Sequence, residues 1–345
     1  MGRREADLAP RPCYTARVLS RVLAFRPASV VGRLPPRSDA CPLSLAELLE
    51  AAPGYRLPSV EASTPDVVRA ALVAAKVLHS AIGLALPAGV APEPWFERVT
   101  RTADEIAAAL PLFLSAEVAL EGEGAPALDR AAQEVWRLVE AGLTHLAFDS
   151  SRVAPPDRAR VLREVAGPAQ ERGLCLDVVL PLVGEGGGLR RAVSLVEELA
   201  RRGLSADAAS VRLPAPEDAE GARAQVAALE RLQEALGGLP LLRRGPVTPA
   251  LLAGLRLSGL RGCEDGGAAA RASGAPLPAT GGEALAERRS RWRARAAAIL
   301  GAEEADRLEA RAFVEAGEFV EALGAEGSAV AVARSLERRL AGEEA

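Results

Sequence analysis

The stretch PLFLSAEVALEGEGAPALDRAAQEVWRLVEAGLTHLAFDSS, residues 111–151, has the order strand, acidic loop, amphipathic helix, glycine turn and strand. This order predicts one βαβ unit, in which a crossover helix joins two parallel strands. Its first strand ends in a carboxylate, Glu117, and in parallel α/β folds the chemistry lies where strands end. The next residue is the aliphatic Val118, where a metal-dependent enzyme would need a ligand. The unit therefore predicts an enzyme fold but leaves open whether the chain is an enzyme.

The same alternation of apolar strands and amphipathic helices continues on both sides of this unit. Two more strands are expected before it and four after it, over Arg56–Ser63, Ala81–Gly89, Leu174–Gly184, Ala206–Pro214, Leu239–Gly245 and Leu260–Gly267. Eight strands over about 210 residues fit a (β/α)₈ TIM barrel. A doubly wound open sheet would show a similar alternation, but eight units favour a closed barrel.

Three regions follow from this pattern. Residues 1–42 are rich in Pro and Arg, have little periodicity and are expected to form a disordered N-terminal arm. Residues 43–270 are the expected TIM barrel. Residues 271–345 are expected to form a linker and a helical C-terminal extension, which packs on the barrel or on a partner subunit. A homo-oligomer or a partner subunit is therefore expected.

Composition excludes several classes of function. The net charge of −4 predicts no nucleic-acid partner, and no apolar run is long enough to predict a membrane span. Four cysteines lie far apart without CxxC spacing, which favours a reducing, cytoplasmic location. The chain has one lysine, Lys76, placed in a helix, and two histidines, His79 and His145. Schiff-base catalysis by a strand lysine and multi-histidine metal sites are therefore not expected, and His145 is interpreted as a satisfied structural histidine.

Acidic and arginine side chains gather at the expected strand ends. These residues are Glu61, Ser63, Glu117, Asp149, Ser150, Ser151, Asp177, Arg212, Arg243, Arg244, Glu264 and Asp265. The mixture suits a small anionic or phosphorylated ligand, held by Arg212, Arg243, Arg244, Gly245 and Asp265. Glu117 and Asp149 are the candidate catalytic residues; for Glu117 the structural alternative is a salt bridge to Arg212 or Arg243. The run GEGGG, residues 184–188, is a weaker candidate for a phosphate-binding loop.

The order of these strands and their amino-acid sequences resemble those of the class II fructose- and tagatose-bisphosphate aldolase family. They also resemble the non-catalytic accessory subunit of tagatose-bisphosphate aldolase. The likeness runs from about residue 44 to about residue 267, through RLPSVEAS, AIGLALPAG, PLFLSAEVA, AGLTHLAFDSS and RRGPVTPALLAGL. On this resemblance Glu117 stands where the family has its catalytic Asp. Val118 stands at the place of the first zinc-binding His, Ser115 replaces the other histidine of that strand, and Arg243 stands at the third ligand's place. Strand six, SVRLP, has no histidine at the second ligand's place. The resemblance therefore implies an aldolase-like barrel without the family's zinc site and without another cofactor.

Two functions remain open. One is a non-catalytic or metal-independent homologue that binds a small phosphorylated or anionic carbohydrate. The other is an active carbon–carbon lyase, a sugar-phosphate aldolase with Glu117 as its acid/base and the three arginines as anion ligands.

Overall fold

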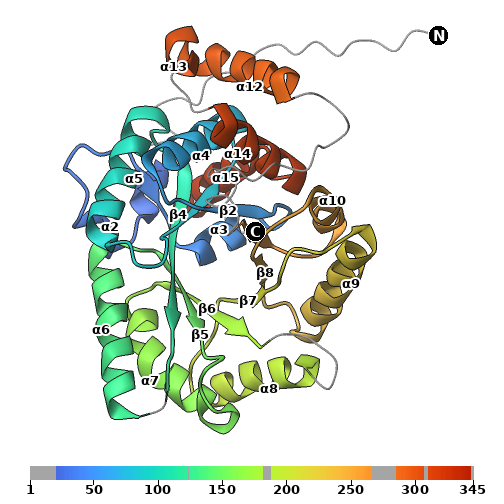
Figure 1. The fold of residues 1–345 in the computed structure, drawn as a ribbon. Coiled ribbons are helices and arrows are strands. Elements are labelled where there is room, and N and C mark those ends of the chain that lie inside the picture. The colour runs from blue at the N-terminus through green and yellow to red at the C-terminus, as the bar shows by residue number, and fades with distance from the viewer. Residues whose placement is uncertain (1–20, 123, 182–187, 266–284, 307–309, 343–345) are drawn as a thin grey trace.

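The computed structural model describes residues 21–122, 124–181, 188–265, 285–306 and 310–342. Eight parallel strands, β2 to β9, form a closed barrel, because β4 pairs with β5 as well as with β3 and so joins the two ends of the strand order. The predicted TIM barrel is confirmed (Figure 1). The strands are β2 (Leu57–Glu61), β3 (Ile82–Ala85), β4 (Pro111–Ala119), β5 (His145–Asp149), β6 (Cys175–Leu180), β7 (Ala208–Arg212), β8 (Leu241–Arg244) and β9 (Gly262–Asp265).

Helices between successive strands form the outer ring. They are α4 (Pro65–Val77), α5 (Pro92–Ile106), α6 (Ala125–Ala141), α7 (Arg158–Glu171, after the short 3-10 helix η2, Pro155–Asp157), α8 (Gly188–Arg201), α9 (Ala219–Ala235) and α10 (Pro249–Leu257). The sequence specifies their ends locally. Thr64 and Thr248 cap α4 and α10 by accepting a hydrogen bond from the third backbone N–H that follows, and each is followed by a proline. Gly142 ends α6 at φ +97°, where a Cβ would run into the Phe96 ring.

The eighth place in the helix ring is taken by α14 (Ala310–Leu323), which lies between α4 and α10 and covers β2. Helices α12 (Leu285–Leu300) and α13 (Ala302–Asp306) pack outside it, with Trp292 buried against Gly317 of α14. The barrel is thus completed by the C-terminal region, and an expected domain limit at residue 270 falls inside it. The physical reason is that the outward faces of β2 and β9 would otherwise be left without an apolar cover.

Residues 21–42 differ from the loose arm expected there, whereas residues 1–20 lie outside the described residues. The segment contains η1 (Leu23–Phe25), α2 (Ala28–Val31) and β1 (Cys41–Pro42), and β1 adds to the start of β4. Val22, Val30 and Cys41 are buried. Asp104 of α5 accepts hydrogen bonds from the backbone N–H of residues 39 and 40. Few but well-placed apolar residues hold a segment that has no helical or strand periodicity.

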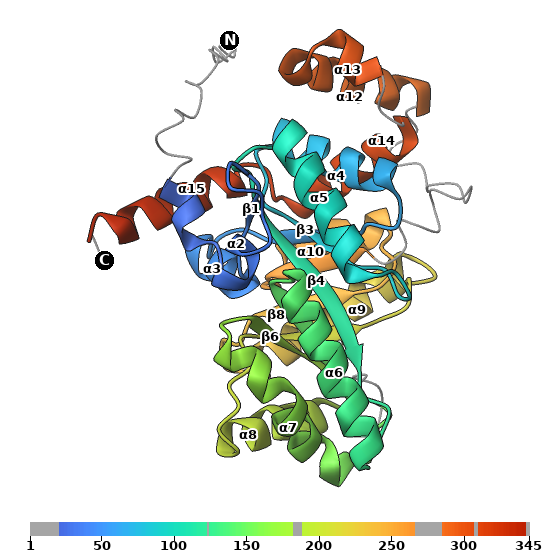
Figure 2. The same ribbon diagram turned by 90° about the vertical axis from the view of Figure 1, so that its left-hand side faces the viewer.

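The N-terminal end of the barrel is closed by α3 (Leu45–Ala51) and α15 (Ser328–Leu340), which pack on each other (Figure 2). Their apolar faces form one cluster with the innermost residues of the barrel, including Leu57, Phe113 and Leu242. This end is therefore filled with side chains, and the opposite end, where the strands finish, is the accessible mouth.

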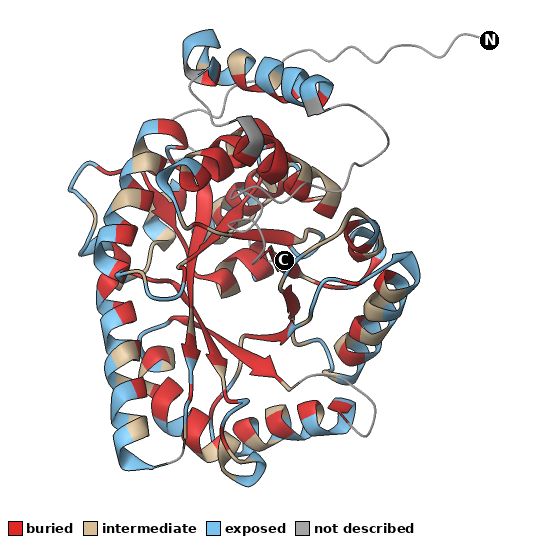
Figure 3. Cartoon of the chain, in the orientation of Figure 1, coloured by how far each residue is buried: buried red, intermediate tan, exposed pale blue. Residues whose placement is uncertain are grey.

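Strand residues alternate between the two sides of the barrel wall, as the period of two requires. Outward residues such as Leu84, Leu114 and Val178 pack under the helices, and Figure 3 shows most of each strand in the colour of buried residues. Inward residues change character along the barrel axis: they are apolar near α3, and most of them are polar from the next layer to the mouth. The polar inward residues are Ser59, Glu61, Ser115, Glu117, His145, Asp149, Asp177, Ser210, Arg212, Arg244 and Glu264.

Candidate functional site

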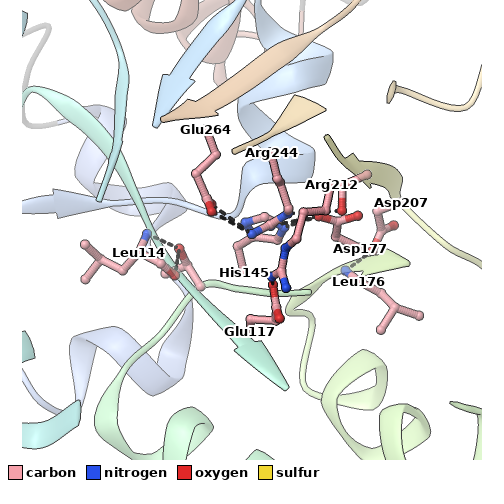
Figure 4. A network of polar contacts seen from close by, with 11 residues as sticks. Leu114, Glu117, His145, Leu176, Asp177, Asp207, Arg212, Arg244 and Glu264 are labelled. Carbon is pink, nitrogen blue, oxygen red and sulfur yellow. Dashed lines mark hydrogen bonds and ion pairs between the residues drawn. The ribbon is translucent and has the colours of Figure 1, made fainter. Parts of the chain in front are cut away.

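An ion pair spans the mouth of the barrel between strands that are not neighbours. Arg212 at the end of β7 donates to the Glu117 carboxylate on β4, and its guanidinium also lies 4.0 Å from Asp149 on β5. The Arg212 side chain is 56% exposed and that of Glu117 24%. The structure thus brings three of the predicted residues together, and the salt bridge expected as an alternative for Glu117 is present (Figure 4).

A second, buried network lies one layer deeper and is centred on Arg244 of β8. Its guanidinium lies 2.9 Å from Asp177 on β6 and 2.9 Å from Glu264 on β9, and its Nε donates to Ser210 Oγ at 3.0 Å. Burial alone would lower the pKa of Arg244 and raise that of Asp177, but their mutual attraction reverses both effects. The pKa of Arg244 is raised by Glu264 first and then by Asp177 and Glu117, and the pKa of Asp177 is lowered by Arg244 and His145. Both groups are therefore charged at neutral pH.

His145, at the start of β5, belongs to this buried network. Its Nε2 lies 3.3 Å from Asp177 Oδ2, and its ring meets Phe113 edge to face. Neither ring nitrogen makes an aligned hydrogen bond with any described residue. His145 thus faces the interior against a carboxylate, and its interpretation as a satisfied structural histidine stays a prediction.

Two carboxylates lie close together on the other side of the interior. Glu61, at the end of β2, and Glu264 come from adjacent strands. Burial and the charge of Glu264 raise the pKa of Glu61 above its usual range. A carboxyl whose pKa is raised beside a second carboxylate is the arrangement used for acid/base work, so Glu61 joins the candidate residues.

Three predicted ligand-binding residues lie elsewhere. Arg243 alternates with Arg244, so it faces the outer layer, where its guanidinium donates to the backbone carbonyls of residues 213, 214, 245 and 246. Asp265 likewise faces outward, beside α14. Gly245 has φ +113°, and a Cβ would collide with the Leu213 carbonyl oxygen, so it serves the turn after β8. The period-two alternation of a strand separates consecutive residues that the sequence presents as one cluster.

The residues present do not fit the zinc that an aldolase-like barrel implies. Val118 is buried under the helices, Ser115 is a hydroxyl, and Arg243 is bound to carbonyl oxygens. Among the described residues, no three His, Cys, Asp or Glu side chains are grouped so that they could hold a metal ion. A catalytic zinc needs three such ligands.

Two further sequence features have a plain structural account. Lys76 donates to the Ile106 carbonyl at the end of α5, and burial lowers its pKa. The GEGGG loop lies outside the described residues except for Gly188, which begins α8.

The barrel interior holds more negatively than positively charged side chains. Five carboxylates and two guanidinium groups of the described chain face it: Glu61, Glu117, Asp149, Asp177, Glu264, Arg212 and Arg244. Arg244 is fully engaged by two carboxylates, whereas Arg212 is exposed. The mouth can therefore accept one anionic group at Arg212, and the remaining groups suit hydroxyls that both donate and accept hydrogen bonds.

Comparisons with solved structures find the same fold in three proteins to which this chain is similar. It is similar to the YdjI aldolase from Escherichia coli K12, with a TM-score of 0.53 and 14% identity over 83% of this chain and 98% of that chain. It is also similar to a putative fructose-1,6-bisphosphate aldolase from Coccidioides immitis, with a TM-score of 0.50 and 14% identity over 83% and 97% of the two chains. A probable tagatose 6-phosphate kinase from Sinorhizobium meliloti 1021 gives a TM-score of 0.50 and 18% identity over 83% and 88%. At these identities the likeness concerns the fold.

No family model matches the sequence, and no curated protein matches it either. Every helix in the described ranges is too short or too polar to cross a membrane.

Proposed function

We propose that this chain is a metal-independent, aldolase-like barrel that binds a small carbohydrate with a single anionic group. The observation that carries the proposal is the exposed guanidinium of Arg212, held at the mouth by Glu117 and near Asp149. A phosphate or carboxylate of the ligand replaces Glu117 on Arg212 and makes charge-assisted hydrogen bonds there. The carboxylates around it accept hydrogen bonds from the ligand's hydroxyls.

The excess of carboxylates limits the ligand's charge. A second phosphate inside the barrel would face Asp177 and Glu264, and Arg244 is already occupied by both. A like charge in a buried site is strongly unfavourable. The proposal therefore distinguishes a monophosphate from a bisphosphate of the same sugar.

Titration calorimetry with fructose 6-phosphate, fructose 1,6-bisphosphate and inorganic phosphate tests this function. We expect the monophosphate to bind more tightly than the bisphosphate, and Arg212→Gln to weaken it at least tenfold, the effect of losing one charge-assisted hydrogen bond. Arg137→Gln is the matched control, because Arg137 pairs with Glu134 on the outer face of α6. Absence of binding by all three compounds would overturn the proposal.

A second candidate is an active carbon–carbon lyase with Glu117 as acid/base. It is favoured by the position of Glu117, a partly exposed carboxylate at the end of a barrel strand. The two candidates differ in what Glu117→Gln does. In a binding protein the variant releases Arg212 and tightens fructose 6-phosphate binding, whereas in a lyase it lowers kcat on sugar phosphates about 100-fold or more.

The lyase assay follows aldehyde release from fructose 6-phosphate and from fructose 1,6-bisphosphate, with Glu121→Gln as the control. Glu121, in the loop after β4, forms an exposed ion pair with Arg152, which follows β5. If the purified chain shows no turnover and Glu117→Gln binds fructose 6-phosphate more tightly, the lyase is excluded and the binding function is supported.

A further inference from the structure

Five polar atoms inside the barrel are buried without a hydrogen bond to any described residue. They are Ser59 Oγ, Ser115 Oγ, Asp177 Oδ1 and the two ring nitrogens of His145, of which Nε2 forms an ion pair with Asp177 Oδ2. All four side chains are at least nine-tenths buried. Buried polar groups are almost always paired in native proteins, because each unpaired one carries a desolvation cost.

These side chains share the barrel interior. Ser115 lies between Leu114 and Ala116, which both pack in the outer core. Its hydroxyl therefore lies on the inward face of β4. In the same way Ser59 lies beside Val60 of the outer core, on the inward face of β2. Ser115 is the register partner of His145, whose Nε2 lies 3.3 Å from Asp177.

The four side chains of Ser59, Ser115, His145 and Asp177 form a polar layer. It lies next to the apolar side chains, including Leu57 and Phe113, that fill the closed end of the barrel.

The chemistry of the polar layer selects a neutral ligand group. Asp177 Oδ1 is a charged acceptor, the two serine hydroxyls donate and accept, and the imidazole offers both functions. Arg244 is engaged by Asp177 and Glu264, so the described part of the chain has no other arginine or lysine at this depth to hold an anion. A hydroxyl fits, because it donates to the carboxylate and accepts from the imidazole or a serine.

The ion pair at the mouth lies over this layer. Glu117 follows Ser115 by two residues on β4, and Arg212 follows Ser210 by two residues on β7, so both lie one layer closer to solvent. Figure 4 shows Arg212 extended to Glu117 in front of His145 and Asp177. The pair therefore lies between the polar layer and the mouth.

We propose that the polar layer of Ser59, Ser115, His145 and Asp177 is a subsite for the ligand's hydroxyl groups, opened when an anionic group of the ligand takes Arg212 from Glu117. The inference rests on the proposed function and deepens it. The anionic group stays at the mouth, and the hydroxyl end of the same molecule enters the barrel.

The two histidines allow a direct test by ¹⁵N NMR of histidine-labelled protein. Exposed His79, beyond the end of α4 at the closed end of the barrel, is an internal control for His145. The probes are glycerol 3-phosphate, which carries two hydroxyls, and n-propyl phosphate, which carries none. We expect both to bind, glycerol 3-phosphate about tenfold more tightly, since each net hydrogen bond contributes a few-fold in affinity. Only glycerol 3-phosphate should shift the His145 resonances, and neither should shift His79.

Ser115→Ala separates a ligand contact from a structural role. It should remove most of the preference for glycerol 3-phosphate and leave n-propyl phosphate binding unchanged. Its Tm should stay the same or rise, because an unpaired buried hydroxyl is removed. The matched control is Ser258→Ala, since the buried Ser258 hydroxyl donates to Leu255 O at the C-terminal end of α10. This variant should lower the Tm and keep the preference.

The possible outcomes are distinct. Equal binding of the two phosphates with unmoved His145 resonances means that only ordered water fills the layer, and it overturns the subsite while the proposed function stands. Absence of binding by either phosphate overturns the proposed function and the subsite with it.

Discussion

Whether a residue belongs to this site depends on the side of the strand on which its side chain lies. Arg243 and Arg244 are adjacent in sequence and opposite in role: one binds loop carbonyls in the outer layer, and the other is the centre of the buried network. Removing one partner from such a network leaves a buried charge uncompensated, which costs more than the pair itself contributes. Asp177 is the clearest example, because it contacts both Arg244 and His145.

Asp177→Asn is expected to lower the free energy of unfolding at pH 7 by about 3 kcal/mol, the lower end of the range for a broken buried pair, because Glu264 still neutralises Arg244. The pKa of Asp177 is lowered in the folded state. Its contribution is therefore present above the unfolded pKa near 4 and is lost as the pH falls through the folded value.

Urea unfolding of both proteins at pH 7 and pH 3 measures this effect, and the difference between them should shrink at the lower pH. Asp157→Asn is the control, since Asp157 forms a surface pair with Arg160 and should change stability by less than about 1 kcal/mol. A constant difference across the pH range would show that Asp177 acts through packing and not through its charge.

Among the elements, α14 has the largest consequence for the fold. It follows the linker region in sequence, yet it lies in the helix ring over β2, with Phe319 and Val320 buried. The amphipathic pattern of residues 310–323 predicted a helix, but the pattern by itself does not say which surface the helix covers. That assignment follows from the uncovered faces of the first and last strands.

Phe319→Ala should lower the free energy of unfolding by about 3–5 kcal/mol, as other large-to-small core substitutions do. A chain ending at residue 284 should fail to unfold cooperatively, because β2 and β9 lose their cover. Leu257→Ala at the end of α10 is the control and should be nearly neutral, because Leu257 is 87% exposed. Cooperative unfolding of the shortened chain, followed by circular dichroism on heating, would show that the C-terminal helices are an addition to a complete barrel.

For the molecule as a whole, both guanidinium groups of the interior are engaged in ion pairs with its carboxylates. The network of Arg244, Asp177 and Glu264 and the pair of Arg212 and Glu117 occupy the side chains that a metal would need. Metal affinity contributes to stability wherever a metal binds the folded state. A barrel whose described residues form no metal site gains no stability from metal binding.

Treatment with EDTA should therefore change neither the Tm nor the affinity for fructose 6-phosphate, and added zinc should not raise the Tm. Scanning calorimetry together with elemental analysis of the purified protein checks this. A stoichiometric metal whose removal lowers the Tm by several degrees would contradict it.

The barrel was predictable from the sequence because its information is local. Strand and helix periods, the threonine caps of α4 and α10 and the glycine ends of helices can each be read within about 20 residues, and all eight strands lie where the pattern placed them. The strand-end position of Glu117, Asp149 and Arg212 was readable for the same reason. Residues 21–42 were not predictable, because only a few scattered apolar residues hold them.

The sequence by itself determined the class of fold, the scarcity of histidine and lysine, and the carboxylates and arginines at the strand ends. The tertiary structure alone decided which of them meet. Closing the barrel brings β4 within reach of β7 and places His145 against Asp177, and the period of two turns Arg243 and Asp265 away from their neighbours. Periodicity is a property of neighbours along the chain, whereas contacts across a barrel depend on register and closure, which no single strand contains.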